Sequence, residues 1–185
     1  MTPHEFIAKW RAAELKERSG SQTHFNDLCS LLDIPDPVSA DPKNEWFTFE
    51  KGVSKTAGNK GWADVWRKNC FAWEYKGRNK DLDRALAQLQ QYAAALDNPP
   101  LLIVSDMDRI RIHTNWTNTV QKVHTIQLTD LTDAATRDLL RHCFTDPEQL
   151  KPAKTRQLLT EEAAQRFATL AQRLRRPEIT RPLHS

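Results

Sequence analysis

Two acidic side chains and a lysine stand close together in a basic stretch of the sequence. Glu74 and Lys76 flank a tyrosine in a short aromatic segment that has the pattern of a β-strand. Alternation along a strand places Glu74 and Lys76 on one face, and Trp73 and Tyr75 on the other. An isolated triplet of this kind usually forms a surface salt bridge. Asp64, however, lies on the preceding predicted strand, where a short turn brings it towards Glu74. Two carboxylates placed in this way repel unless a divalent cation bridges them, and oxygen ligands favour a hard cation such as Mg²⁺.

The residues that follow these acids add to the same predicted site. Lys76 beside a bound cation is placed to activate a water molecule or to stabilise charge that develops on a phosphate. Gln88 and Tyr92 lie on an amphipathic helix predicted to begin at Asp81, and their spacing of four residues puts them on one helix face. Such pairs are also common on ordinary amphipathic helices. The sequence therefore predicts a site built from two strands and the helix after them.

The charge of the chain is concentrated around these residues. The 185-residue protein has a net charge of +3, whereas residues 51–80 alone carry eight basic and two acidic side chains. A basic island in an otherwise acidic chain indicates a surface that faces a polyanion, usually nucleic acid, although a solvated lysine-rich loop gives the same count. The residues predicted to contact a DNA backbone are Lys51, Lys55, Lys60, Arg67, Lys68, Arg78 and Lys80.

Hydrophobic periodicity and breaker residues place the elements that must position the site. Helices are predicted over residues 4–18 and 23–34, with Ser19-Gly20-Ser21 ending the first and Thr23 capping the second. Strands are predicted over 46–49, 62–66, 70–76, 101–105, 110–112 and 123–128, with a loop over 51–61. Further helices are predicted over 81–96, 131–144 and 160–175. This order predicts an α/β core with a mixed β-sheet flanked by helices, followed by a C-terminal helical tail.

Composition narrows the class of protein further. The chain has 39% hydrophobic residues and is long enough to bury a core without disulfide bonds or a structural metal. No apolar run approaches the roughly 20 residues of a membrane span, and no secretory signal is visible. Cys29, Cys70 and Cys143 are odd in number and widely spaced, as expected of reduced thiols. These features predict a cytoplasmic protein with no membrane partner.

The combined pattern resembles the PD-(D/E)xK nuclease superfamily. Asp64 is followed after nine residues by Glu74-Tyr75-Lys76 and then by a helical Gln88-x-x-x-Tyr92. The resemblance implies that Asp64 and Glu74 bind the catalytic metal, that Lys76 serves the attacking water, and that Gln88 and Tyr92 support the site. The backbone carbonyl of Tyr75 is expected as a third metal ligand, and Glu17 is the candidate for an additional, helix-borne acid.

Longer sequence motifs narrow this resemblance to one family. Over residues 4–175 the chain is similar to the N-terminal nuclease domain of the MmeI-like (type IIL) restriction–modification enzymes. The similar motifs include Gly61-Trp62-Ala63-Asp64-Val65-Trp66, Phe71-Ala72-Trp73-Glu74-Tyr75-Lys76 and Ile112-His113-Thr114-Asn115. In that family a helical spacer, an adenine-N6 methyltransferase and a target-recognition domain follow. The glycine loop for S-adenosylmethionine is absent from this sequence, so this chain is not expected to bind that cofactor.

The resemblance implies a PD-(D/E)xK restriction-endonuclease-like core in residues 1–144, with a linker and the start of a helical spacer in residues 145–185. The implied activity is Mg²⁺-dependent DNA cleavage in a restriction–modification or phage-defence system, with Mn²⁺ as a substitute metal. The implied partners are DNA and a separate methyltransferase or target-recognition part. Two copies on DNA are expected, since one centre cuts one strand. The alternative is a non-catalytic DNA-binding or assembly module whose nuclease centre is unused.

Overall fold

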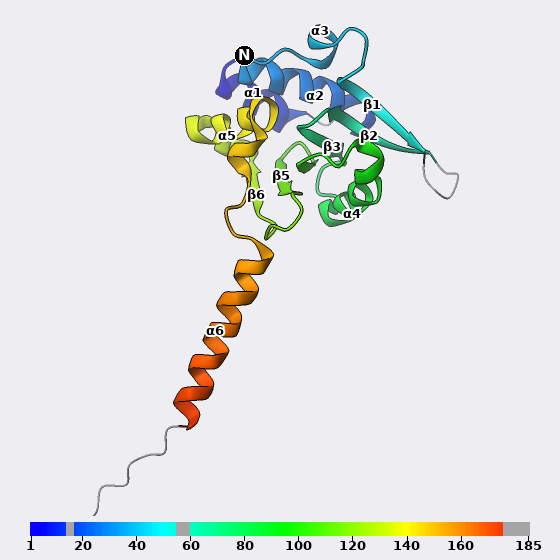
Figure 1. Cartoon of the computed structure of the whole chain (residues 1–185). Helices are drawn as coiled ribbons and strands as arrows, with labels where there is room; N and C mark the ends of the chain where they lie inside the picture. The colour runs from blue at the N-terminus through cyan, green and yellow to red at the C-terminus, as the bar shows by residue number, and fades with distance from the viewer. Residues whose placement is uncertain (14–16, 55–59, 176–185) are drawn as a thin grey trace, which may run out of the picture. The chain divides into compact units, whose positions relative to one another are not determined.

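The computed structural model describes residues 1–13, 17–54 and 60–175, with residues 17–19, 53–54 and 60–62 described by their backbone only (Figure 1). The described chain forms two compact units. The first consists of residues 1–116 and 121–151, and the second of residues 117–120 and those from 152 onward. The candidate site lies in the first unit.

A six-stranded mixed sheet forms the centre of the first unit. Its strands lie in chain order: β1 (Phe47–Ser54), β2 (Lys60–Arg67), β3 (Phe71–Tyr75), β4 (Leu101–Ser105), β5 (Arg109–Thr114) and β6 (Val123–Gln127). All neighbouring strands are antiparallel except β3 and β4, which are parallel. Parallel neighbours need a crossover connection, and α4 (Leu82–Tyr92) supplies it. The predicted α/β fold with a mixed sheet is confirmed.

Helices cover both faces of this sheet (Figure 1). On one face, α1 (Pro3–Ala12), α2 (Glu17–Leu32) and α5 (Ala134–Thr145) pack on the large side chains of β3, which include Trp73 and Tyr75. On the other face, α4 packs through Leu89 and its neighbours on the small Ala72 and on Val104. The strand thus presents large residues to three helices and small ones to a single helix. The prediction that Trp73 and Tyr75 share a face is confirmed.

The sequence prediction was wrong at the start of the chain. Ser19-Gly20-Ser21 does not end a helix but lies inside α2, and Thr23 lies in that helix rather than capping it. Glycine destabilises a helix by about 1 kcal/mol relative to alanine, so the local sequence does not favour a helix that continues through Gly20. Gly20 and Ser21 are buried, however, and small residues allow α2 to approach its neighbours closely. Tertiary packing therefore overrides the local signal.

Two other boundaries differ from the prediction. The segment 51–61, expected to be a loop, is mostly strand, because β1 runs to Ser54 and β2 begins at Lys60, which pairs with it. Glycines and lysines do not prevent strand pairing where both strands continue a ladder.

The remaining short elements are α3 (Pro37–Ala40) and three 3₁₀ helices: η1 (Ala93–Leu96), η2 (Leu128–Thr132) and η3 (Pro147–Leu150).

The second unit consists mainly of α6 (Arg156–Arg175), which begins four residues earlier than predicted. Within this unit Thr119 and Thr155 form an isolated β-bridge, and the Val120 N–H donates to the Lys154 carbonyl at 3.0 Å. No described residue of α6 is buried. Across the described residues, none of the helices is both long enough and apolar enough to cross a membrane.

Candidate functional site

The register of β2 and β3 explains the nine-residue spacing between the two acids. These antiparallel strands pair Val65 with Trp73, and Asp64 and Glu74 are the residues directly beyond that pair. The Asp64 carboxylate accepts a hydrogen bond from the Tyr75 backbone N–H, with 2.6 Å between Oδ2 and N. Asp64 therefore lies against the backbone that carries Glu74 and Lys76, as predicted from the hairpin.

The ladder between β1 and β2 is irregular at the same place. Regular pairs flank the site, Phe49 with Val65 and Lys51 with Ala63, whereas Glu50, which stands opposite Asp64, has a left-handed backbone with φ of 51°. Val65 belongs to the first core cluster and Ala63 to the second, although strict alternation would place both on one face. A non-glycine residue in this conformation costs about 1 kcal/mol or more, and such irregularities in strands re-aim side chains. We attribute the orientation of the Asp64 carboxylate to this irregularity.

Glu74 is the centre of a hydrogen-bonded cluster. Its side chain is 5% exposed, and one carboxylate oxygen, Oε1, accepts from Lys76 Nζ at 2.7 Å and from Gln88 Nε2 at 3.2 Å. Glu74 and Lys76 do form an ion pair, but not the solvated surface pair expected of an isolated triplet. A charge-assisted contact held at low exposure is shorter and stronger than an exposed one.

The parallel crossover places the lysine and the glutamine around Glu74. Lys76 follows the end of β3, and its backbone N–H donates to the Ser105 carbonyl at the end of β4 at 2.8 Å. On α4, the predicted start is confirmed, because Asp81 is the N-cap and its carboxylate accepts from two backbone N–H groups. Leu89 packs on the sheet, so the neighbouring Gln88 is held within reach of Glu74.

Tyr75 is held by two contacts, one from its backbone and one from its side chain. Its backbone N–H donates to Asp64, and its hydroxyl lies 2.9 Å from Nδ1 of His24 on α2. The His24 ring is buried between Phe6, Trp10 and Tyr75, with edge-on contacts at 4.7–5.5 Å between ring centroids. Burial lowers the pKa of His24 to about 3 and raises the pKa of Tyr75. The histidine is therefore neutral at physiological pH and braces the strand behind the site.

Other predicted site residues lie in different surroundings. Tyr92, one turn beyond Gln88, is buried in the second core cluster beside Leu89. Glu17 is the first residue of α2, but its side chain falls outside the described part of the structure, as does that of Lys60. Lys55 lies outside the described residues altogether.

The predicted DNA-contacting residues divide into exposed and engaged side chains. Lys68 and Lys80 are exposed. Lys51 lies over the Trp66 ring at 4.3 Å, and Arg67 lies over Trp46 at 5.0 Å. These contacts hold both cations against aromatic faces.

Arg78 is engaged in a different way. Its guanidinium pairs with Asp108 at 2.7 Å and also donates to the backbone carbonyl of Trp10 at 2.7 Å. Arg78 thus ties α1 to the turn between β4 and β5.

The donor set of the site is compatible with Mg²⁺. Asp64 and Glu74 provide carboxylate oxygens only, and Mg²⁺ is commonly held by one or two carboxylates while it keeps several water molecules. Within the described ranges, no group of three or more histidine, cysteine, aspartate or glutamate side chains is arranged to hold a metal. A site here would therefore rest on these two acids, backbone oxygen and water.

The first unit thus gathers two carboxylates, a lysine and a helix-borne glutamine around a parallel crossover. The chain belongs to the family described as "MmeI, N-terminal domain", whose model matches residues 1–177. The resemblance to the N-terminal domains of MmeI-like restriction–modification enzymes is thereby confirmed.

The chain is similar to a chain in a solved structure described as "cryoEM structure DrdV-DNA complex", with 16% identity and a TM-score of 0.46. The similarity covers 80% of this chain and 14% of that chain, so this protein spans a small part of its neighbour's length. No curated protein matches the chain.

Proposed function

We propose that this chain is a Mg²⁺-dependent DNA endonuclease domain of a restriction–modification or phage-defence system. The observation that carries the proposal is the cluster in which Lys76 and Gln88 both donate to Oε1 of Glu74, beside Asp64. Membership of the MmeI N-terminal domain family supports the restriction–modification context.

Asp64 and Glu74 would hold Mg²⁺, with the Tyr75 carbonyl as a third protein ligand. When bound, the metal supplies charge stabilisation at a phosphate oxygen and lowers the pKa of a bound water. Hydrogen bonds hold both acids in place, which supports this proposal. Asp64 is fixed by the Tyr75 N–H, and Glu74 is fixed by Lys76 and Gln88. Since these contacts already orient the carboxylates, little conformational freedom is lost when the site is used.

Lys76 would orient the attacking water and stabilise the negative charge that grows on the phosphate. In the reaction a bond forms between the water oxygen and phosphorus, and the bond from phosphorus to one sugar oxygen breaks. The water loses a proton to solvent and the leaving oxygen gains one. Lys76 Nζ is within 2.7 Å of Glu74 Oε1, so its ammonium group stays beside the acids. A cation held in this position favours the more negative transition state over the ground state.

Gln88 and Tyr92 would order the site from α4, and Glu17 remains a candidate additional acid. Gln88 does so directly, through its hydrogen bond to Glu74. Tyr92 is buried one turn further along the same helix, where it supports the packing of α4 on the sheet. Tyr92 is therefore proposed as a positioning residue and not as a group that touches DNA.

DNA affinity would come from the basic side chains of residues 51–80, which contact phosphates without reading sequence. Sequence choice would come from a methyltransferase and target-recognition part. One centre cuts one strand, so two copies on DNA would be needed for a double-strand break. S-adenosylmethionine is assigned to the separate methyltransferase part.

Plasmid cleavage under different metal conditions tests this function. The full chain is incubated with supercoiled plasmid at low salt with Mg²⁺, with Mn²⁺, or with EDTA. We expect nicked or linear DNA in both metals and intact plasmid in EDTA. Binding of labelled duplex is measured in parallel. Metal-independent binding with intact plasmid in every arm would contradict the proposal and favour the non-catalytic DNA-binding module instead.

A further inference from the structure

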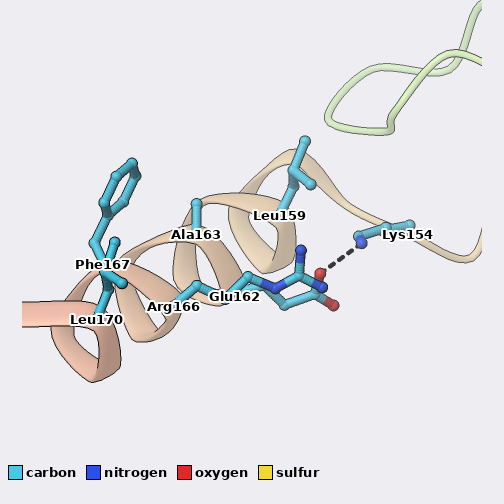
Figure 2. Close-up of a pocket in the computed structure, with 7 residues that line it drawn as sticks. All are labelled: Lys154, Leu159, Glu162, Ala163, Arg166, Phe167 and Leu170. Carbon is cyan, nitrogen blue, oxygen red and sulfur yellow. Dashed lines mark hydrogen bonds and ion pairs between the residues drawn. The ribbon is translucent and has the colours of Figure 1, made fainter. Parts of the chain in front are cut away.

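Two regions of the protein lie outside the candidate site: a groove along α6 in the second unit and the helix pair α1–α2 in the first. The groove is lined by residues that include Leu159 and Phe167, and the ion pair of Lys154 with Glu162 lies beside it (Figure 2). These contacts are confined to the second unit. The α1–α2 pair, by contrast, packs on β3 in the same unit as the site.

The end of β3 is supported differently from the rest of that strand. In the described strands, the backbone pairs between β2 and β3 end at Trp73, whereas β4 pairs with β3 to its last residue. Glu74 comes directly after Trp73, and the Tyr75 N–H donates to the side chain of Asp64 in place of a backbone carbonyl. The segment that carries Glu74 and Lys76 thus depends on side-chain contacts along one of its edges.

The α1–α2 pair supplies two further contacts to this segment. The Tyr75 side chain lies on the face of the sheet that α1 and α2 cover, and its hydroxyl is 2.9 Å from Nδ1 of His24 on α2. Three residues later, Arg78 Nη2 donates to the backbone carbonyl of Trp10 on α1 at 2.7 Å. We call these two contacts, His24–Tyr75 and Trp10–Arg78, the α1–α2 clamp. Its two contacts hold the chain on either side of Lys76.

The helix side of the α1–α2 clamp is tightly packed. Trp10 is 0% exposed and His24 is 1% exposed, and their ring centroids are 4.7 Å apart in an edge-on contact. The Trp10 indole N–H donates to Asp27 on α2 at 2.9 Å, which joins the two helices. Close-packed interiors leave little room for side chains to shift. The clamp therefore ties the end of β3 to a rigid part of the core.

We infer that the α1–α2 clamp positions Glu74 and Lys76 for phosphodiester cleavage, with His24 and Arg78 as its positioning residues. This inference rests on the proposed function. Neither residue touches the reacting atoms, because each acts through the strand. Contacts that orient the groups around a metal commonly change metal affinity or activity by about 10-fold to 100-fold when they are lost. In this arrangement Arg78 serves the strand and not the DNA backbone.

Amide exchange at position 75 tests the clamp without requiring cleavage. Tyr75→Phe removes only the hydroxyl, His24→Leu removes its partner, and His24→Gln keeps a group that can pair with the hydroxyl. In the first two variants we expect the amide at position 75 to exchange about tenfold faster relative to the Ile103 amide on β4, which reports global stability. His24→Gln should restore the wild-type ratio. His113→Leu, which replaces a similarly buried histidine on β5, is the matched control.

Metal binding and cleavage test whether the clamp acts on the site. In Tyr75→Phe and His24→Leu, we expect Mn²⁺ affinity measured by EPR spectroscopy to fall about tenfold. The kcat for plasmid nicking should fall by about the same factor, with an unchanged KM for DNA. His24→Gln should restore both quantities, and His113→Leu should change neither.

The outcomes separate this inference from the proposed function. A wild type that binds Mn²⁺ but does not nick DNA would overturn the proposed function, and amide exchange and Mn²⁺ affinity would then decide the inference. An unchanged exchange ratio in both Tyr75→Phe and His24→Leu would overturn the inference. Faster exchange with unchanged Mn²⁺ affinity and kcat would also overturn it, because the contact would then be structural only.

Arg78 distinguishes the clamp from a DNA contact. Arg78→Met keeps the aliphatic stem and loses the guanidinium, and we expect about tenfold lower kcat with an unchanged salt dependence of DNA binding. Asp108→Asn, which alters the other partner of Arg78 and leaves the Trp10 carbonyl in place, is the control and should retain the wild-type kcat. A salt slope shallower by about 0.9 with an unchanged kcat in Arg78→Met would make Arg78 a phosphate contact and overturn its assignment to the clamp.

Discussion

The Asp64 carboxylate and the Tyr75 backbone N–H are joined by a 2.6 Å hydrogen bond between adjacent strands. This contact fixes an acid from β2 to the strand that carries Glu74 and Lys76. It also separates two roles of Asp64, since the hydrogen bond needs only an acceptor oxygen, whereas metal binding needs the charge.

Asparagine at position 64 should therefore separate folding from activity. In Asp64→Asn the side-chain oxygen can still accept from Tyr75, so we expect a melting temperature close to that of the wild type but at least about 100-fold slower plasmid cleavage. In Asp64→Ala the Tyr75 N–H loses its acceptor, which costs about 1–3 kcal/mol of unfolding free energy. Thermal melts and nicking rates on both variants check this. Unimpaired cleavage by Asp64→Asn would remove Asp64 from the site.

Gln88 should act on the site through Glu74. Gln88→Ala removes one of the two donors to Glu74 Oε1, and a lost hydrogen bond of about 1.4 kcal/mol corresponds to a tenfold slower cleavage rate. Gln91→Ala, an exposed glutamine on the same helix, is the matched control. DNA affinity should be the same for both variants. Equal cleavage rates for the two would show that the contact with Glu74 has no functional role.

The basic segment should determine the salt dependence of DNA binding. Replacing Lys51, Lys55 and Lys60 by alanine removes three cations, so the slope of log K against log salt should become shallower by about 2.7 for duplex DNA. A matched triple variant of exposed lysines elsewhere, Lys43, Lys122 and Lys151, should change the slope little. Equal slopes for the two triple variants would argue against phosphate contacts in the 51–80 segment.

Two buried histidines should make the protein sensitive to acid. Burial lowers the pKa of His24 to about 3 and, together with the nearby Arg111, lowers the pKa of His113 to about 4. The unfolded chain titrates near 6.5, so between these values the unfolded state binds more protons and stability falls with falling pH. From pH 7 to pH 5 the loss is about 2 kcal/mol for each histidine.

Urea unfolding at several pH values measures this loss. The stabilisation is complete above about pH 7 and decreases as the pH falls through 6.5 towards 4. His113→Gln cannot titrate and should show a shallower pH dependence than the wild type over this range. His4→Gln is the control, because His4 is exposed near the N-terminus. A variant with an unchanged slope would show that folding does not lower the pKa of His113.

Much of the fold was predictable because its signals are local. The α4 helix begins at its Asp81 cap, as predicted, and the continuous apolar run of Leu101–Ser105 is a buried strand. The later part of α2 was also predicted, but its start before Thr23 was not, because the buried Gly20 depends on tertiary packing. Local propensity does not report such packing.

In the candidate site, too, some features were predictable from local sequence and others were not. The spacing of Asp64 and Glu74 follows from an antiparallel hairpin, and that of Gln88 and Tyr92 from a helix, so sequence patterns could indicate them. His24 lies 51 residues from Tyr75 in sequence, and no local pattern links the two. The left-handed backbone of Glu50 could not be predicted either, because glutamate is not a residue type that favours this conformation. Both features depend on tertiary packing.

The central claim is that Asp64, Glu74 and Lys76 form one hydrolytic centre, and the most direct measurement is plasmid nicking by Lys76→Ala. The wild type, Asp64→Ala and Lys76→Ala are purified identically and incubated with supercoiled plasmid, Mg²⁺ and low salt. Lys43→Ala, an exposed lysine outside the 51–80 segment, is the control. We predict that the wild type and Lys43→Ala nick the plasmid, while Asp64→Ala and Lys76→Ala do not, although both still bind DNA. Equal nicking by all four proteins would contradict the assignment of this centre.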